Sequence, residues 1–392
     1  MPNLNFAEDF SLNKKEKIMN HKQEQSGKAN DLTRRKFMRD GAAAAAGLTV
    51  GLGAAGSNSA YAEGVISKTR NYNPEMEYRR LGKTNIWVSA VCLGGHWKRV
   101  DKMLPGVFKG QGWLSADLES GGFRKNRRDV VTRCIESGIN YIDACTMQEI
   151  LAYAEALRGR RDAMFLGFSW YQEEMRREQY RTTNALLGTL DKGMREAKLD
   201  YVDLWRITMH EQSGRHTEAE VDQMMGALEK ARKQGKVRFT GLSSHDRPHI
   251  KWMIETYPTV LQVVVTPYTA KSKVLPKDSV FDAIQKHDVG FFGIEPFAGT
   301  SLFKGDSSPD SPTAEEDDRL ARMAIRYILC NPAIAAPIPG MINPHQVDNV
   351  VKAVKERREL DVAEAEELEK AMDEAWARLP ANYQWLKDWE YV

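Results

Sequence analysis

Four polar side chains stand where apolar stretches of the chain end. Asp143 closes one such stretch, and His96, His210 and His245 each follow another. A carboxylate together with imidazoles is the composition of a general acid–base site or of a divalent metal site. Each side chain can equally cap its own loop. Separate caps are the simpler interpretation, and we assign no metal ligand.

The elements that would position these side chains are repeated helix–strand units. Residues 138–143 form a short apolar run that follows a Gly stop and an amphipathic stretch, and similar runs recur at the following positions: 162–167, 201–205, 236–241, 260–265 and 289–294. Strands that alternate with helices pair in parallel through right-handed crossovers, and the common closed solution at this length is an eight-unit barrel. The sequence therefore predicts an α/β fold, a (β/α)8 TIM barrel, with Asp143 at the mouth where strands end.

Composition excludes several classes of partner. The 392 residues are 42% hydrophobic and 28% charged, with 56 Lys and Arg against 54 Asp and Glu. Such a balance gives no basic surface for nucleic acid or for an anionic membrane. The cysteines, Cys92, Cys134, Cys145 and Cys330, lack metal-type spacing and are expected to be free buried thiols.

The first 62 residues have the pattern of an export signal. A polar stretch leads to Arg34-Arg35, a weakly apolar Ala/Gly-rich run follows, and Ala60-Tyr61-Ala62 ends it. Twin arginines before such a run predict a twin-arginine signal peptide at 1–62, a linker at 63–75 and a folded domain at 76–392. We expect the twin-arginine machinery as a partner, membrane contact only through this segment, and a periplasmic or cell-envelope location.

The folded domain resembles the aldo-keto reductases. The resemblance rests on YRRLGKTNIWVSAVCLGG at 78–95, NYID at 140–143, GKVRFTGLS at 235–243, PFAG at 296–299 and APIPGM at 336–341. It implies a barrel closed at the bottom by an N-terminal hairpin, with a C-terminal helix packed outside. It also implies reduction of carbonyls with NAD(P), using Asp, Tyr, Lys and His at successive strand ends.

The resemblance carries over only part of that tetrad. Asp143 matches the Asp, whereas Gln148 stands at the Tyr position, Ser169 at the Lys position and Thr208 at the His position. His210 follows two residues after Thr208 and could occupy the same space. Asp143 and His210 are therefore the candidate catalytic residues.

The cofactor contacts that the resemblance implies are also incomplete. Ser243 and Ser244 match a pair that holds the carboxamide, and Tyr268 matches the aromatic that stacks on nicotinamide. The remaining matches are to the pyrophosphate loop and the adenosine end: Pro296, Phe297, Ala298, Gly299, Gly340, Met341, Gln346 and Asn349. No basic residue stands at the place of a 2′-phosphate contact, so NAD, NADP or neither remain open.

Because only part of the family's catalytic and cofactor-binding residues is retained, two functions remain open. The first is a nicotinamide-dependent oxidoreductase that interconverts carbonyls and alcohols of an unknown small-molecule substrate. The alternative is a catalytically degenerate barrel that binds a small ligand outside the cytoplasm.

Overall fold

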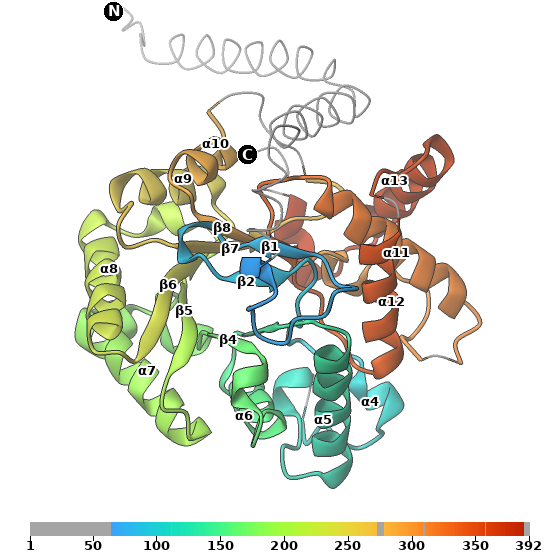
Figure 1. Cartoon of the computed structure of the whole chain (residues 1–392), viewed down its shortest axis with the longest axis horizontal. Coiled ribbons are helices and arrows are strands. Elements are labelled where there is room, and N and C mark those ends of the chain that lie inside the picture. Colours follow the sequence, from blue (N-terminus) through green and yellow to red (C-terminus); the bar gives the residue numbers. More distant parts are fainter. Residues whose placement is uncertain (1–63, 111, 273–277, 309, 357, 388–392) are drawn as a thin grey trace, which may run out of the picture. The chain divides into compact units, whose positions relative to one another are not determined.

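The computed structural model describes residues 64–387, apart from 111, 273–277, 309 and 357. The predicted export signal at 1–62 lies outside these residues. A ring of strands surrounded by helices dominates the described part of the chain (Figure 1). Within it, no helix has the length and apolarity needed to cross a membrane.

Seven parallel strands pair in the order of the sequence, each with the next. Their bounds are β3 Tyr141–Ala144, β4 Phe165–Phe168, β5 Val202–Thr208, β6 Val237–Ser243, β7 Val263–Pro267, β8 Gly290–Ile294 and β9 Ala336–Pro337. The register aligns Asp143 with Gly167, and Thr208 with Ser243. Strand ends that carry polar residues therefore lie at the same edge of the sheet.

An irregular segment closes the ring between β9 and β3. Leu93 forms a parallel bridge with Ile142, and Gly94 forms one with Gly340. The Leu93 amide donates to the Tyr141 carbonyl (3.0 Å), and the Cys92 amide donates to the Pro337 carbonyl (3.1 Å). The first barrel position is thus filled without a regular strand, and the predicted eight-unit barrel is confirmed.

A hairpin covers the amino-terminal end of the barrel, as predicted. Strands β1 (Tyr78–Arg80) and β2 (Trp87–Ser89) pair antiparallel, and Figure 1 shows them across the ring. The Lys83 amide donates to the Asp288 carbonyl (2.6 Å), just before β8 begins. The opposite end of the barrel carries the loops and the site.

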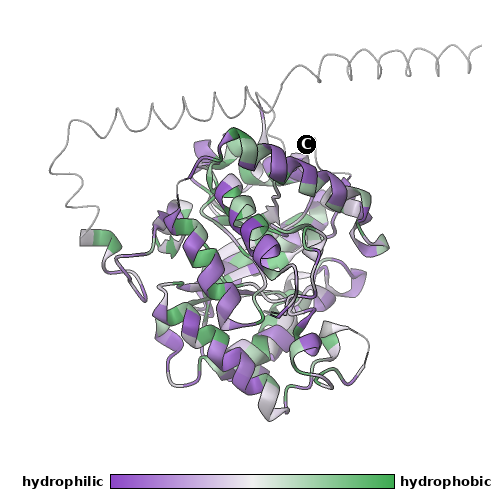
Figure 2. Ribbon diagram, turned by 90° about the vertical axis from the view of Figure 1, so that its right-hand side faces the viewer, coloured by the Kyte–Doolittle hydropathy of each residue, from purple (hydrophilic) through white to green (hydrophobic). Residues whose placement is uncertain are grey.

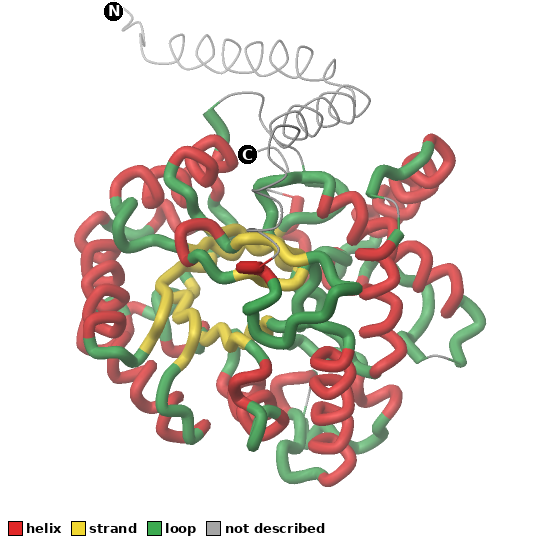
Figure 3. Tube along the Cα trace, in the orientation of Figure 1, coloured by secondary structure: helices red, strands yellow, loops and turns green. Residues whose placement is uncertain are grey.

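Helices form the outer layer (Figure 3). Their bounds are α4 Val100–Met103, α5 Gly121–Glu136, α6 Met147–Ala156, α7 Thr183–Ala197, α8 Glu218–Lys233, α9 Arg247–Thr256, α10 Val280–Lys286, α11 Ala314–Leu329, α12 Pro344–Lys355 and α13 Val362–Ala377. Figure 2 shows hydrophobic and hydrophilic residues interleaved along these helices, as expected for helices with one buried face. A short 3-10 segment, η8 (Ala381–Lys387), follows α13.

Alternation along the strands separates two apolar clusters. The inner cluster includes Tyr141, Leu204, Val263 and Phe292, whereas Ile142 belongs to the cluster between the strands and the helices. Because successive strand side chains point to opposite faces, Asp143 shares the inner face with Tyr141. The barrel interior is therefore apolar below and polar at the mouth.

Part of the predicted linker is bound to the barrel instead of exposed. The Arg70 guanidinium donates to the Asp203 carboxylate (3.1 Å) and to the Met164 carbonyl (3.0 Å). The Asn71 side-chain amide donates to the Ile135 carbonyl (2.7 Å). Polar contacts therefore attach the chain to the barrel from residue 69 onward, within the predicted linker.

Candidate functional site

A cavity of about 400 Å³ opens at the carboxyl ends of the strands. Its wall combines Asp143, Arg206 and Ser243 from three strands with the loops before α6, α11 and α12 and with the C-terminal segment η8. Volumes of this order accommodate small organic ligands. The strand tips thus gather residues from position 94 to position 385 around one space.

A buried ion pair forms the floor of the cavity. Arg206 on β5 donates from Nε to Oδ1 of Asp143 (3.0 Å), and its Nη2 bonds the other carboxylate oxygen. The side chains are 4% and 6% exposed, respectively. The Tyr141 hydroxyl donates to Oδ1 of Asp143 (3.2 Å), and Nη1 of Arg206 donates to the Thr208 hydroxyl (2.9 Å). This network fixes both charged groups where they meet the cavity.

The pair reaches across a strand because that strand has no side chain at the crossing point. Gly167 on β4 lies between β3 and β5, and a Cβ atom there would sit 2.2 Å from the Tyr141 hydroxyl and 2.9 Å from Oδ1 of Asp143. Gly167 therefore leaves the space that the carboxylate and its partners fill.

A second buried carboxylate, that of Glu174, lies next to Ser169 and Thr208 beside the ion pair. Glu174 accepts hydrogen bonds from the Ser169 hydroxyl (2.6 Å), the Thr208 amide (2.7 Å) and the Trp205 indole (3.3 Å). Burial raises the pKa of the Glu174 carboxyl. Ser169 and Thr208 stand where the family has Lys and His; Glu174 accepts from the Ser169 hydroxyl and the Thr208 backbone amide, and the two hydroxyls contact each other (2.7 Å).

A third carboxylate joins two loops at the cavity edge. Glu149 on α6 is fully buried and accepts hydrogen bonds from the His96 amide (2.6 Å) and the Cys145 amide (2.6 Å). Burial raises the pKa of this carboxyl to about 6. The Cys145 sulfur lies 3.8 Å from Nε2 of His96. Cysteine, histidine and glutamate therefore meet at one point of the wall.

An aromatic and a cationic side chain line the wall after β4. Tyr171 is half-buried, and the Arg176 guanidinium lies 5.0 Å from the centre of its ring. Arg176 also pairs with Glu211 (2.8 Å). Burial raises the pKa of the Tyr171 hydroxyl. Tyr171 therefore contributes a protonated phenol to the cavity lining.

The C-terminal segment η8 covers part of the mouth. The Trp385 ring stacks on His245 with 4.0 Å between centroids, and the Tyr383 hydroxyl donates to Oε1 of Glu295 (3.2 Å). The Lys98 ammonium lies 4.2 Å from the Tyr383 ring centre. Burial lowers the pKa of the His245 imidazole well below its usual range. The aromatic tail is thus a wall of the cavity as well as a packed terminus.

Most of the predicted site residues line this cavity. They are Asp143, Ser243, Pro296, Phe297, Gly299, Gly340, Met341, Gln346 and Asn349. Gly299 has φ +64°, and a Cβ atom there would lie 2.6 Å from the Tyr383 ring. Asn349 is engaged by the Arg322 guanidinium (2.7 Å) and donates to the Asp318 carbonyl (2.9 Å).

Four predicted residues lie outside the cavity wall. Ala298 is buried, and the Ser244 hydroxyl bonds to Ser213 (2.8 Å) within the loops. His210 accepts a hydrogen bond from the Gln212 amide (3.1 Å) at Nδ1, so its ring is bonded within its own loop. The neighbouring Glu211 lines the cavity instead. The catalytic position predicted for His210 is therefore not supported by its placement.

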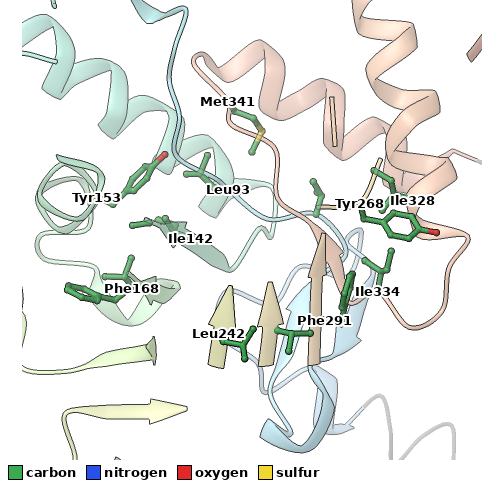
Figure 4. Close-up of a cluster of buried hydrophobic side chains, with 14 of the residues drawn as sticks. Leu93, Ile142, Tyr153, Phe168, Leu242, Tyr268, Phe291, Ile328, Ile334 and Met341 are labelled. Atoms are coloured by element: carbon green, nitrogen blue, oxygen red, sulfur yellow. The ribbon is translucent and has the colours of Figure 1, made fainter. Parts of the chain in front are cut away.

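Tyr268 points away from the mouth. It is fully buried, packs edge-on against Phe281 and Phe291, and bonds to Asn331 (3.3 Å). Figure 4 shows its ring among apolar side chains that include Ile328. Alternation along β7 gives the reason, because Val263 and Val265 face inward and Tyr268, three places after Val265, faces the helices. The stacking role predicted for Tyr268 lacks the geometry it requires.

Sequence reasoning missed Arg206, Glu149, Tyr171 and the tail contacts. Arg206 lies two residues before Thr208 on β5, so the period of two that places Thr208 at the mouth also places Arg206 on the inner face. A charged residue on the inward-facing set of β5 was the available signal. Glu149 lies in the first turn of α6 and Tyr171 in a short 3-10 segment after β4, and the strand periodicity does not predict their direction.

Comparisons with known proteins agree with this architecture. The sequence pattern of the Aldo/keto reductase family matches residues 121–373. An uncharacterised oxidoreductase of Bacillus subtilis is 21% identical over 327 residues, which cover 72% of this chain and 92% of that protein. An aldo-keto reductase of Schizosaccharomyces pombe, named for NADP(+), is 26% identical over 209 residues, covering 50% of this chain and 59% of that protein.

Solved structures give the same result for the fold. An aldo-keto reductase from Bacillus halodurans in its holo form is similar with a TM-score of 0.53 and 20% sequence identity, covering 76% of this chain and 96% of that chain. Its apo form gives a TM-score of 0.51 with the same identity and coverage.

Proposed function

Because the chain belongs to the aldo/keto reductase family and is an oxidoreductase of that type, we propose that it interconverts a small carbonyl compound and its alcohol with a nicotinamide dinucleotide. The Asp143–Arg206 pair carries this proposal. A carboxylate that orients a cation at the cavity floor reproduces the arrangement that the family resemblance implies, with arginine from β5 in place of lysine.

Arg206 would bind the substrate oxygen and stabilise its charge. Asp143 and Thr208 fix the guanidinium, so its position is set before a substrate arrives. Arginine stays protonated at any pH compatible with folding, so it can donate hydrogen bonds but cannot release a proton. A separate group must therefore transfer the proton.

Tyr171 is the residue we propose for that transfer. Tyr171 lines the cavity, and the Arg176 guanidinium above its ring would stabilise the phenolate left after donation. Tyr153, the nearest tyrosine to the lost family position, is fully buried and donates to the Gly94 carbonyl (2.6 Å). It therefore cannot contact a substrate.

The cofactor would supply the hydride, and the residues present fit it at the end formed by α12. The loop at Gly299 and the first turn of α12, with His345 and Gln346, line that end, and a helix N-terminus favours a phosphate. Asp317 and Asp318 line the same end, and carboxylates there would repel a 2′-phosphate. We therefore propose NAD as the preferred dinucleotide.

Binding and turnover test this proposal separately. Protein purified without added nucleotide is titrated with NADH and with NADPH while intrinsic fluorescence and thermal unfolding are followed. We expect saturable binding with a preference for NADH, and reduction of members of an aldehyde and ketone panel that Arg206→Met abolishes. Turnover that Arg206→Met leaves unchanged would contradict the assigned mechanism.

The small-ligand-binding alternative has one observation in its favour. The Ser169 hydroxyl donates to Glu174 (2.6 Å) and the Thr208 hydroxyl contacts Ser169 (2.7 Å), so neither family position carries the lysine or histidine of the family's proton relay. Under this alternative the same cavity binds a small molecule without turnover. Failure to detect dinucleotide binding by titration, by thermal shift or in the purified protein would favour it.

We further propose that residues 1–62 direct export through the twin-arginine route. The support is the order of Arg34-Arg35, the weakly apolar run and Ala60-Tyr61-Ala62. Fractionation of cells that produce the Arg34→Lys/Arg35→Lys variant should find the protein retained in the cytoplasm, whereas the native sequence reaches the cell envelope. Equal distribution of the two would overturn the assignment.

A further inference from the structure

We propose that His96, Cys145 and Glu149 bind a zinc ion, with one coordination position open to the cavity. One atom from each side chain, a ring nitrogen, the thiol sulfur and a carboxylate oxygen, lies within 4.8 Å of the other two. Neither the family resemblance nor the proposed hydride transfer requires this site, and it stands independently of both.

The distances are close to those of tetrahedral zinc. The Cys145 sulfur lies 3.8 Å from Nε2 and 3.9 Å from Nδ1 of His96, and Nδ1 lies 3.5 Å from Oε1 of Glu149. Zinc–sulfur and zinc–nitrogen bonds of ordinary length place sulfur and nitrogen roughly 3.6 Å apart at a tetrahedral angle. A few tenths of an ångström and a turn of the imidazole would complete the geometry.

The backbone holds these ligands in place. A Cβ atom at residue 95 would lie 2.0 Å from the Glu149 carboxyl, so Gly95 lets the loop approach the carboxylate. His96 itself has φ +58°, a conformation that non-glycine residues rarely adopt. The Glu149 oxygens accept one amide hydrogen each from His96 and Cys145 and retain a lone pair for a metal ion. Strain at a ligand loop is common at functional sites.

The donor set selects the type of ion. One thiolate, one imidazole and one carboxylate favour zinc over magnesium or calcium, which prefer oxygen ligands alone. Binding would release the Cys145 thiol proton, and the two negative ligands would neutralise the ion. The nearby Arg206 charge is already paired with Asp143, which reduces its repulsion of a cation.

All three side chains line the cavity, so the remaining position faces it. Three protein ligands with an open fourth position form the arrangement of zinc sites that bind an oxygen of a small molecule. The class of ligand that fits is a compound with a carbonyl or carboxylate oxygen. A closed structural zinc site would instead require a fourth protein ligand.

The test uses the whole protein freed of metal by a chelator and then titrated with zinc ions alone. We expect one zinc ion per chain, measured by competition with a chelating dye, and a higher melting temperature with zinc. Cys145→Ser should weaken binding at least about 100-fold, more than the loss of an outer hydrogen-bond partner of a ligand. Cys330→Ser, which removes a half-buried thiol at the end of α11, is the matched control and should bind as the native protein does.

Two further measurements test whether His96 and Cys145 are the zinc ligands. His96→Asn retains a side chain that tolerates positive φ, so it should fold normally while binding zinc far more weakly. Cobalt ions should give a thiolate charge-transfer absorption that Cys145→Ser removes. Native protein that folds but binds no zinc, or Cys145→Ser and His96→Asn variants that bind it with native affinity, would overturn the proposal.

Discussion

Arg206 donates two hydrogen bonds to Asp143 across an intervening strand, because that strand carries Gly167 at the crossing. The carboxylate and the guanidinium are both nearly inaccessible to solvent. Each charge therefore depends on the other for stabilisation, and removal of one partner leaves the other buried and unpaired in the barrel.

Arg206→Met should lower the free energy of unfolding by about 3–5 kcal/mol, because it leaves the Asp143 carboxylate buried without its cation. The Asp143→Asn/Arg206→Met double variant should recover much of this loss, since no unpaired charge remains. Urea unfolding of the native protein and of both variants measures the difference. A double variant that is the less stable of the two would contradict the pairing.

Gly167→Ala should destabilise the protein by about 1–3 kcal/mol, since the added methyl group collides with the Tyr141 hydroxyl and the Asp143 carboxylate. Gly188→Ala is the matched control, because Gly188 is exposed within α7 and no atom lies within 4 Å of the added Cβ. That control should raise stability by up to about 1 kcal/mol. Thermal and urea unfolding compare the two.

His216 should make stability depend on pH. Burial lowers the pKa of its imidazole to about 4, whereas the unfolded value is about 6.5. Below pH 6.5 the unfolded chain binds a proton that the folded His216 does not, so stability falls as pH drops from 6.5 to about 4 and is unaffected above 6.5.

His216→Gln isolates this contribution. The variant should lose up to about 2–3 kcal/mol less than the native protein between pH 7 and pH 4. Urea unfolding at intervals across that range measures the difference. Parallel pH profiles of the two proteins would rule out the titration of His216 as a cause.

Tyr383→Ala should strengthen dinucleotide binding. The ring fills the space at Gly299, so it must move before a phosphate reaches the loop amides. If that movement costs about 1.4 kcal/mol, its removal lowers Kd about tenfold. Tyr383→Phe keeps the ring and loses only the hydrogen bond to Glu295, so its Kd should stay near the native value. Weaker binding by Tyr383→Ala would instead make the ring part of the binding surface.

The sequence patterns by themselves determined the barrel and the position of Asp143, and the resemblance to the aldo-keto reductases added the hairpin. Period-two strands, period-3.6 helices and their alternation are local patterns, and parallel pairing follows from them. A local pattern also predicts a helix cap. An Asp before a Pro-containing first turn is a typical N-cap, and Asp246 caps α9 by accepting from the His249 amide (3.2 Å).

Only the tertiary structure decided which side chains meet at the mouth. Arg206 reaches Asp143 across a glycine of another strand, and Glu149 brings His96 and Cys145 together from two loops. The Tyr268 side chain points away from the cavity and bonds to Asn331, and the His210 ring bonds to Gln212 within its own loop, although both residues lie near strand ends. Direction in an irregular loop depends on contacts with segments far along the chain. Periodicity is a property of neighbours in sequence, and it cannot encode such contacts.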